Sequence, residues 1–342
     1  MEMSWGTLVT DSYDILWKMI IRPPRSSYSL EDLGPVKFRI GSQGFQREDF
    51  QLKNQRGMKL ECSWYRPLRS KPAQATPSAP CVVYLHGNCS SRMEALDILQ
   101  VVLPKDMSVF SVDFSGSGQS EGDYISLGHF EQHDLRVVVD YLRQSGSVSA
   151  VGLWGRSMGA ATSILRAAED WELAALVVDS PFSSLPMVAQ ELVNSQMAVP
   201  EFMLGMALGM VRKEIQTRAN FDIEELLPIK AAPRARSPCL FAVAKDDDFV
   251  LPHHTYDLHN AWGANSRKLV TFEGGHNGAR PRWFLEEASG FLKVHLTAAA
   301  KVSVDLVTEE SEAVPSASSA PPAARAAKVP AEPPMELRRP LQ

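Results

Sequence analysis

Short apolar runs that resemble buried strands alternate with longer runs of helical periodicity through most of this chain of 342 residues. The strand-like runs cover residues 81–86, 107–113, 148–154, 174–179, 238–244 and 267–272. The helix-like runs lie near residues 91–102, 129–144, 158–169, 254–262 and 282–296. Such alternation is typical of β-α-β units, so the pattern predicts an α/β fold: a mostly parallel sheet with helices on both faces. Residues 36–66 precede the alternation and predict antiparallel strands.

The same pattern sets the expected domain boundaries. Because 44% of the chain is hydrophobic, one domain over residues 30–297 can bury a sizeable core. Residues 183–237 interrupt the alternation with two or three helical patterns, more than a crossover needs, and predict a small helical cap. Residues 298–342 hold no aromatic residue and are rich in proline, which predicts a disordered tail.

Residues 1–29 are expected to form an amphipathic helix and a linker. Apolar residues recur at helical spacing up to Pro23 and Pro24, which end the helix. We expect the helix to pack on the domain, and weak contact with a membrane surface is the alternative. Lys18 and Arg22 are too few to make a basic interfacial face.

Charge and composition exclude several classes of protein. The net charge of −5 gives no basic footprint, so nucleic acid is not an expected partner. No stretch approaches 18 apolar residues and no secretory signal is evident, so we expect a soluble cytoplasmic protein, peripheral to a membrane if the first helix makes that contact. Cys81 and Cys239 lie in apolar runs and are expected to be buried thiols in a reducing compartment. The sequence does not indicate an oligomeric state.

A serine stands between two glycines where a strand-like run becomes a helix-like run, in Gly155-Arg156-Ser157-Met158-Gly159. A tight strand-to-helix turn exposes a serine hydroxyl for nucleophilic attack, and the flanking positions need glycine because neighbouring backbone passes close by. The N–H of Met158, at the start of the helix, is placed for an oxyanion. The alternative is a Gly-Ser turn that only caps a helix.

A second oxyanion donor is expected in the segment after residues 81–86. Gly87 is predicted to turn the loop sharply, so that the N–H of Asn88 faces the oxyanion. His86 is expected to fix this loop through its ring nitrogens rather than act as a base, because a better-placed histidine follows downstream.

Four aspartates are candidates for the acid of a catalytic triad. Asp246, Asp247 and Asp248 follow the strand-like run 238–244, and since neighbouring side chains point apart, one of them should face the site. Asp179 ends an earlier strand-like run and is the rival candidate.

The base is expected to be His276, because it alone among eight histidines lies in a loop beyond the last strand-like run and C-terminal to the other candidates. Gly274 and Gly275 allow that loop to reach back over the serine.

With these residues, the chain resembles the α/β-hydrolase superfamily over roughly residues 30–297. More narrowly, it resembles the serine aminopeptidase S33-like and monoacylglycerol-lipase-like hydrolases. The matching segments are "IRPPR", "YLHGN", "VDFSGSGQSEG", "GRSMGA", "VVDSPFSSL", "FDIEELLPIKAA", "AKDDDFVLPHH" and "GGHNGARP". The family pattern Gly-x-x-Asp-x-x-Val falls on Ala244 through Val250 and selects Asp247, with Ala244 in place of the usual glycine. The resemblance does not transfer a substrate.

The expected function is serine hydrolysis of ester, thioester or amide bonds by Ser157, His276 and Asp247, with no metal or organic cofactor. The apolar cap favours acyl esters. An aminopeptidase is the alternative, and it would need an anionic group for the substrate's free amine. Candidates for that group are Glu191, Glu201 and Glu214. A fold that binds a ligand without catalysis is a further alternative.

Two other motifs are expected to be structural. His129 and His133 lie one helical turn apart, but Glu131 is misplaced for a zinc-protease motif and no third ligand is apparent. The Gly116-Ser117-Gly118 turn lacks the features of a nucleotide loop. Asp113, just before it, is expected to accept hydrogen bonds from local backbone amides.

Overall fold

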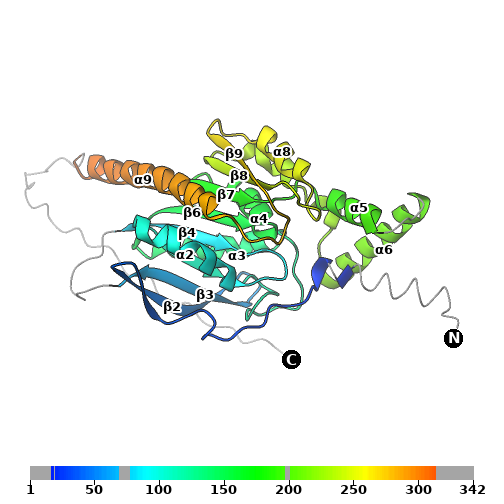
Figure 1. Cartoon of the computed structure of the whole chain (residues 1–342), viewed down its shortest axis with the longest axis horizontal. Coiled ribbons are helices and arrows are strands. Elements are labelled where there is room, and N and C mark those ends of the chain that lie inside the picture. Colours follow the sequence, from blue (N-terminus) through cyan, green and yellow to red (C-terminus); the bar gives the residue numbers. More distant parts are fainter. Residues whose placement is uncertain (1–16, 19, 69–77, 197–200, 313–342) are drawn as a thin grey trace, which may run out of the picture. The chain divides into compact units, whose positions relative to one another are not determined.

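The computed structural model describes residues 17–18, 20–68, 78–196 and 201–312. The chain divides into a large unit, residues 1–303, and a small unit, residues 304–342. Within the described residues nine strands form one sheet in the order β1-β2-β3-β5-β4-β6-β7-β8-β9 (Figure 1). They are β1 (Lys37–Ile40), β2 (Gln43–Lys53), β3 (Lys59–Pro67), β4 (Ala79–Leu85), β5 (Ser108–Val112), β6 (Val148–Arg156), β7 (Ala175–Asp179), β8 (Cys239–Ala244) and β9 (Arg267–Phe272). Every strand-like run in the sequence is a strand.

The sheet is antiparallel at one side and parallel elsewhere, which confirms the predicted α/β class. β1, β2 and β3 pair antiparallel, as do β3 and β5, and all other neighbours are parallel. β4 lies between β5 and β6, so the chain changes the direction in which it adds strands at this point. In open α/β sheets, ligands bind outside the carboxyl ends of the strands near such a switch point.

The carboxyl ends of the parallel strands are in register. Leu85 at the end of β4 pairs with Gly155 of β6, and Ala244 at the end of β8 pairs with Phe272 at the end of β9. The loops after β4, β6, β8 and β9 therefore leave the same edge of the sheet. These loops carry the candidate residues selected from the sequence.

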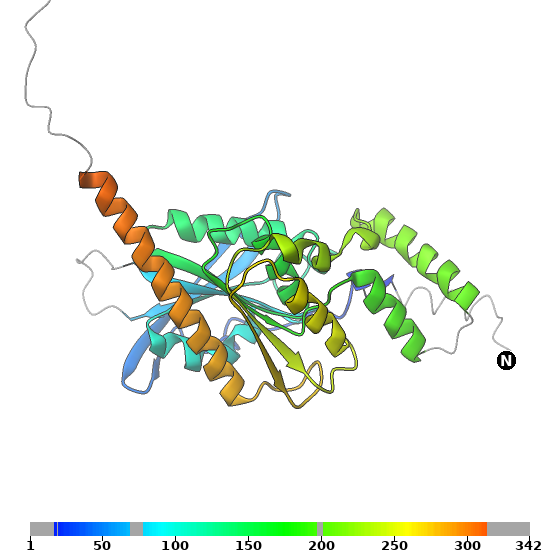
Figure 2. The same ribbon diagram turned by 90° about the horizontal axis from the view of Figure 1, so that it is seen from above.

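Helices cover both faces of the sheet with separate apolar layers. The first layer includes α3 (Glu131–Gln144), α4 (Met158–Ala167) and α8 (Pro252–Ala261), and the second includes η1 (Arg92–Ala95), α2 (Leu96–Val102), η2 (Leu103–Lys105) and the start of α9 (Arg282–Glu312). Figure 2 shows α3 and α9 on opposite sides of the sheet. Val83 of β4 packs in the first layer and its neighbours Val82 and Tyr84 in the second. A strand buried on both faces reads as an apolar run, which is why the sequence revealed it.

The insertion between β7 and β8 is helical. It contains α5 (Leu185–Gln196), α6 (Glu201–Ala219), η3 (Ile223–Glu225), α7 (Pro228–Ala231) and η4 (Ala232–Arg234). The Leu185 N–H donates to the Leu226 carbonyl, and the Ile229 N–H donates to the Ser183 carbonyl, so the two ends of the insertion lie side by side.

The described end of the N-terminal segment packs on the domain. Trp17 and Ile21 are helical and buried in the first apolar layer. The Arg218 guanidinium of α6 lies 4.4 Å from the Trp17 ring centre, and the Ile125 N–H donates to the Ile21 carbonyl. Residues 1–16 lie outside the described residues, so membrane contact by the predicted helix stays a prediction.

The last helix is longer than predicted. A disordered tail was expected from residue 298, but α9 continues to Glu312. The physical reason is local: residues 298–312 hold three alanines and three glutamates, which favour helix, and the first strong helix breaker is Pro315. The rest of the predicted tail, residues 313–342, lies outside the described residues.

Three of the four thiols are buried, and Cys89 is exposed. Burial raises the pKa of the Cys81 thiol to about 12 and the pKa of the Cys239 thiol well above its ordinary value. Both therefore stay protonated at neutral pH and pack as small apolar side chains, as expected. Over the described part of the chain, no helix has the length and hydropathy to cross a membrane.

Candidate active site

The junction of β6 and α4 holds a residue with an unusual backbone. Ser157 has φ 51° and ψ −115°, outside the regions that residues with a side chain normally adopt. Its N–H donates to the carbonyl of Asp179 on the neighbouring strand β7 at 2.8 Å, which fixes the turn. The predicted sharp strand-to-helix bend is therefore present, with Ser157 at its apex.

The two glycines that flank the bend are required by space. A Cβ at Gly155 would lie 2.3 Å from the carbonyl oxygen of Gly159, and a Cβ at Gly159 would lie 2.0 Å from that of Leu85. Backbone atoms cannot yield at such distances. Neither glycine has a positive φ, so close approach rather than conformational freedom excludes a side chain here.

His276, from the loop after β9, reaches Ser157. Its Nε2 lies 2.9 Å from the Ser157 Oγ, although the two residues are 119 positions apart in sequence. Each residue is 7% exposed, so the contact is largely shielded from solvent. An imidazole nitrogen at this distance can accept the proton of the hydroxyl.

Asp247 lies on the other side of the imidazole. Its Oδ2 is 2.7 Å from Nδ1 of His276, and its Oδ1 accepts the backbone N–H groups of Phe249 and Val250. The carboxylate therefore fixes the ring with Nδ1 protonated and Nε2 free to accept from Ser157. Asp246 and Asp248 are exposed, and Asp246 instead accepts the N–H of Gly274.

Asp179, the rival candidate, has a different partner. Its two carboxylate oxygens accept from Nε and Nη2 of Arg280 at 2.7 and 3.0 Å, and both side chains are buried. Nη1 of Arg280 also donates to the carbonyls of Gly275 and Gly278, in the loop that carries His276. Asp179 thus holds this loop in place through Arg280.

His86 is fully buried beneath the loop after β4. Its Nε2 accepts the backbone N–H of Phe114 at 3.1 Å, so Nδ1 carries the proton and donates to the Gly87 carbonyl at 2.8 Å. Both ring nitrogens are occupied by backbone groups. The ring ties the β4 loop to the end of β5 and lies outside the Ser157–His276–Asp247 row.

Gly87 does not make the turn that was predicted for it. It lacks a positive φ; the left-handed residue of this loop is Cys89, with φ 63°. The Asn88 side chain supports that turn by accepting the Cys89 N–H. A Cβ at Gly87 would meet the Ser157 Cβ at 3.8 Å, an ordinary contact, so glycine here keeps the space beside Ser157 open.

The two amides predicted as oxyanion donors belong to segments that adjoin Ser157. Met158 is the first residue of α4, and the first N–H groups of a helix have no partner inside it. Ala161 supplies the first intrahelical bond, to the Ser157 carbonyl. Asn88 directly follows the β4 loop glycine, and β4 is the neighbour of β6. Both amides are thus in segments adjoining Ser157.

Arg156 forms a network of hydrogen bonds and an ion pair that the sequence did not predict. Its Nη2 donates to the carbonyls of His276 and Gly278, and its Nη1 lies 3.2 Å from a Glu94 oxygen. The other Glu94 oxygen accepts the Gly87 N–H at 2.8 Å. One ion pair therefore connects the β4 loop, the bend at Ser157 and the histidine loop. The only sequence signal is that a charged residue occupies a variable position of the serine motif.

The other motifs have structural surroundings. Asp113 is buried and accepts the backbone N–H groups of Arg92 and Gln119, together with the Tyr28 hydroxyl. A Cβ at Gly118 would collide with the Asp113 carboxylate. His129 stacks on the ring of Phe221.

A family model described as "Serine aminopeptidase, S33" matches residues 76–222. The chain is 30% identical over 257 residues to the monoglyceride lipase of Rattus norvegicus, covering 66% of this chain and 82% of that protein. The chain is also 26% identical over 198 residues to the uncharacterized protein YqkD of Bacillus subtilis. That alignment covers 57% of this chain and 64% of YqkD, which is less than two thirds of the relative's length.

Among solved structures, the fold is similar to the Pyrococcus furiosus esterase Pf2001. The TM-score is 0.62 at 20% sequence identity, and the alignment covers 80% of this chain and 99% of the esterase. At this identity the likeness concerns the fold.

Proposed function

This chain belongs to the serine aminopeptidase S33-like group of α/β-hydrolases, and on that premise we propose that it is a serine hydrolase acting through an acyl-enzyme, with acyl esters as its preferred substrates. The observation that carries the proposal is the continuous hydrogen-bonded row from the Ser157 Oγ through His276 to Asp247. The hydrolase family implies a small-molecule substrate.

In the first half of the reaction, Ser157 Oγ attacks the acyl carbon while His276 Nε2 accepts the hydroxyl proton. The charged imidazolium is stabilised by Asp247, which already accepts from Nδ1. His276 then gives the proton to the leaving alkoxide, thiolate or amine, and the acyl group remains on Ser157. In the second half, water attacks the acyl carbon and His276 accepts its proton. His276 then gives that proton to the Ser157 Oγ as the bond to the acyl group breaks and the acid product leaves.

The negative charge that develops on the carbonyl oxygen needs donors. The N–H groups of Met158 and Asn88 are proposed for this role, because one opens helix α4 and the other follows the glycine that adjoins Ser157. The α4 N-terminus adds a favourable field for negative charge. His86, Gly87, Gly155 and Gly159 support these donors without touching substrate.

The contacts of the insertion favour esters over peptides. An aminopeptidase needs a carboxylate that is free to receive an amine, yet Glu191 is bonded to His253 and His254, and Glu214 is paired with Arg218. The side chain of Glu201 is outside the described residues. The monoglyceride lipase likeness also favours acyl esters, while the description of the family model keeps a peptidase as the second candidate.

The test compares turnover of p-nitrophenyl esters of increasing acyl length with turnover of aminoacyl-p-nitroanilides. We expect faster hydrolysis of the esters; faster hydrolysis of the anilides would make the peptidase the better assignment. A fluorophosphonate probe should label the wild-type chain and leave Ser157→Ala unlabelled. An unlabelled wild type would favour a binding protein without catalysis.

A further inference from the structure

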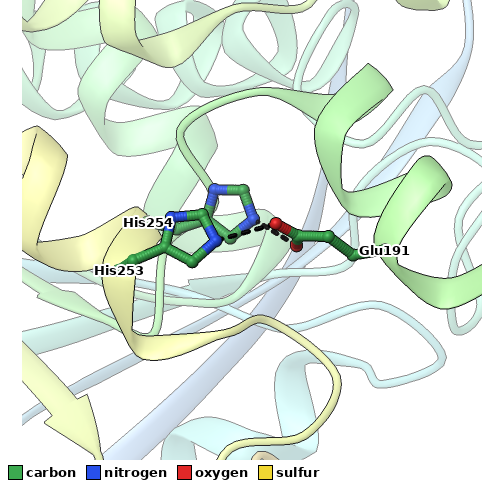
Figure 3. Close-up of side chains that lie close together, drawn as sticks. All are labelled: Glu191, His253 and His254. Carbon is green, nitrogen blue, oxygen red and sulfur yellow. Dashed lines mark hydrogen bonds and ion pairs between the residues drawn. The ribbon is translucent and has the colours of Figure 1, made fainter. Parts of the chain in front are cut away.

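A second cluster of reactive side chains lies away from Ser157. Glu191 on α5 meets His253 and His254 at the start of α8, and Figure 3 shows both imidazoles turned toward the carboxylate. His253 Nε2 lies 2.7 Å from Oε1 of Glu191, and His254 Nε2 lies 2.9 Å from Oε2. Within the described residues, this is the one group of at least three His, Cys, Asp or Glu side chains whose donor atoms all lie within 4.8 Å of each other.

The outer nitrogens of both rings also have partners. Nδ1 of His254 lies 2.7 Å from the Ser183 Oγ, and Nδ1 of His253 lies 3.5 Å from an Asp257 oxygen. As the rings stand, each Nε2 donates to the Glu191 carboxylate, and Nδ1 of His254 accepts the Ser183 N–H. An oxygen beside Nδ1 can take up the proton in the other tautomer, which leaves Nε2 free to bind a metal. The cluster therefore has three inner atoms that can bind a metal, and each ring has an oxygen near Nδ1 that can accept the proton when Nε2 binds the metal.

Burial of the cluster is uneven. His254 is fully buried, whereas the side chains of Glu191 and His253 are 23% and 42% exposed. A metal could enter from the exposed side and keep a water ligand there, while the buried ring fixes the inner side.

We propose that Glu191, His253 and His254 form a binding site for a divalent transition metal of the zinc type. Two imidazole nitrogens and one carboxylate oxygen match the ligand preference of Zn²⁺, and water from the exposed side supplies the fourth position. On binding, the proton of each neutral ring stands on Nδ1, donated to Ser183 Oγ and to Asp257. The Ser183 N–H, 3.3 Å from Nδ1 of His254, then loses that nitrogen as an acceptor.

The site would join the insertion to the segment that holds Asp247. α5 opens the insertion, while α8 begins at Pro252, two residues after Val250, whose N–H donates to Asp247. A bound metal therefore fastens α5 against α8 and restrains both. This role is independent of the reaction proposed for Ser157.

The experiment uses full-length, tag-free protein treated with a chelator and then titrated with zinc chloride in a calorimeter. We expect one zinc per chain and a raised unfolding temperature, because a ligand that binds only the folded state stabilises it. Glu191→Gln and His253→Ala should each weaken zinc binding at least tenfold, and Ser183→Ala by roughly tenfold. His253 is partly exposed, so its variant is expected to fold, as circular dichroism will verify.

Two controls separate this site from other effects. His133→Gln replaces an exposed histidine outside the cluster and should bind zinc as the wild type does. Ser157→Ala should also bind normally, so a failure of the hydrolase proposal leaves this test intact. If the wild type takes up no zinc, or if Glu191→Gln and His253→Ala bind as tightly as the wild type, the proposal is wrong. In that case the cluster only joins α5 to α8 by hydrogen bonds, and the negative charge of Glu191 is stabilised by the N-terminus of α8.

Discussion

At the scale of single residues, two buried aspartates at the same sheet edge have chemically different partners. Asp247 faces the imidazole of His276, while Asp179 faces the guanidinium of Arg280. A carboxylate that faces imidazole can tune proton transfer, whereas one that neutralises a buried arginine mainly keeps that cation tolerable inside the protein. Substitutions at the two positions should therefore fail in different ways.

Asp247→Asn should lower kcat for ester hydrolysis by roughly 10³- to 10⁴-fold, because the amide no longer fixes the required tautomer of His276. The loss of unfolding free energy should be small compared with the loss of transition-state stabilisation that the fall in kcat represents. Steady-state kinetics and urea unfolding of the purified variant measure the two quantities.

Asp179→Asn is the matched control, and it should destabilise the fold by about 3 kcal/mol, since Arg280 is left buried without its counter-charge. The folded fraction should lose far less turnover than Asp247→Asn does, although the loop that carries His276 is then held less firmly. If instead Asp179→Asn abolishes turnover and Asp247→Asn leaves it intact, Asp179 is the acid and our assignment is wrong.

At the scale of elements, the site depends on how closely β4, β6 and α4 approach. The Gly159 position touches the backbone of β4, so any side chain there pushes α4 away from the sheet. Helix α6 has glycines at positions with no neighbour within 4 Å, which offer a comparison inside the same chain.

Gly159→Ala should destabilise the protein by at least about 3 kcal/mol or prevent folding, because the Cβ would overlap the Leu85 carbonyl. Gly209→Ala on α6 should stabilise by about 0.5 to 1 kcal/mol, because alanine has the better helix propensity. Chemical denaturation of both variants tests the contrast. Equal effects would mean that the close packing at Gly159 is relaxed in solution.

Arg156→Met should reduce kcat by about 10- to 100-fold with little change in KM, since it releases the histidine loop from the bend while Ser157 and His276 remain. Arg136→Met removes an exposed ion pair with Asp140 and is the control, with kcat expected at the wild-type value. An Arg156 variant with unchanged kcat would show that the network is dispensable for turnover.

The elements that the sequence predicted share one property: their signal is local. β8 is an unbroken apolar run, and the bend at Ser157 is marked by glycines within two positions of it. The pairing of Arg280 with Asp179, and of Arg156 with Glu94, links residues far apart and leaves no periodic trace. The choice of Asp247 among three neighbours also needed the family pattern, because alternation alone fixes only that one side chain faces inward.

At the scale of the whole molecule, the burial of each cysteine shows whether it lies inside the apolar core or at the surface. Cys62, Cys81 and Cys239 belong to the first apolar layer, and Cys89 is exposed in the loop beside Asn88. Burial raises the pKa of each of the three core thiols, so neither access nor ionisation favours their reaction.

A thiol reagent such as dithionitrobenzoate should modify one cysteine per native chain, Cys89, and all four after unfolding. The rate at Cys89 should rise with pH, because desolvation also raises its pKa and the thiolate forms only in alkaline solution. Cys89→Ser should leave the native chain unreactive. Fast reaction of a second thiol would mean that the layer opens more readily than its packing indicates.

β9 is the final strand to leave the ribosome, and the imidazole that Ser157 needs comes from the loop just beyond it. On the proposed mechanism, a nascent or proteolysed chain that stops short of this strand lacks the base that accepts the proton of the serine. The proposed hydrolytic activity is therefore expected only late in synthesis, once the carboxyl-terminal edge of the sheet is complete.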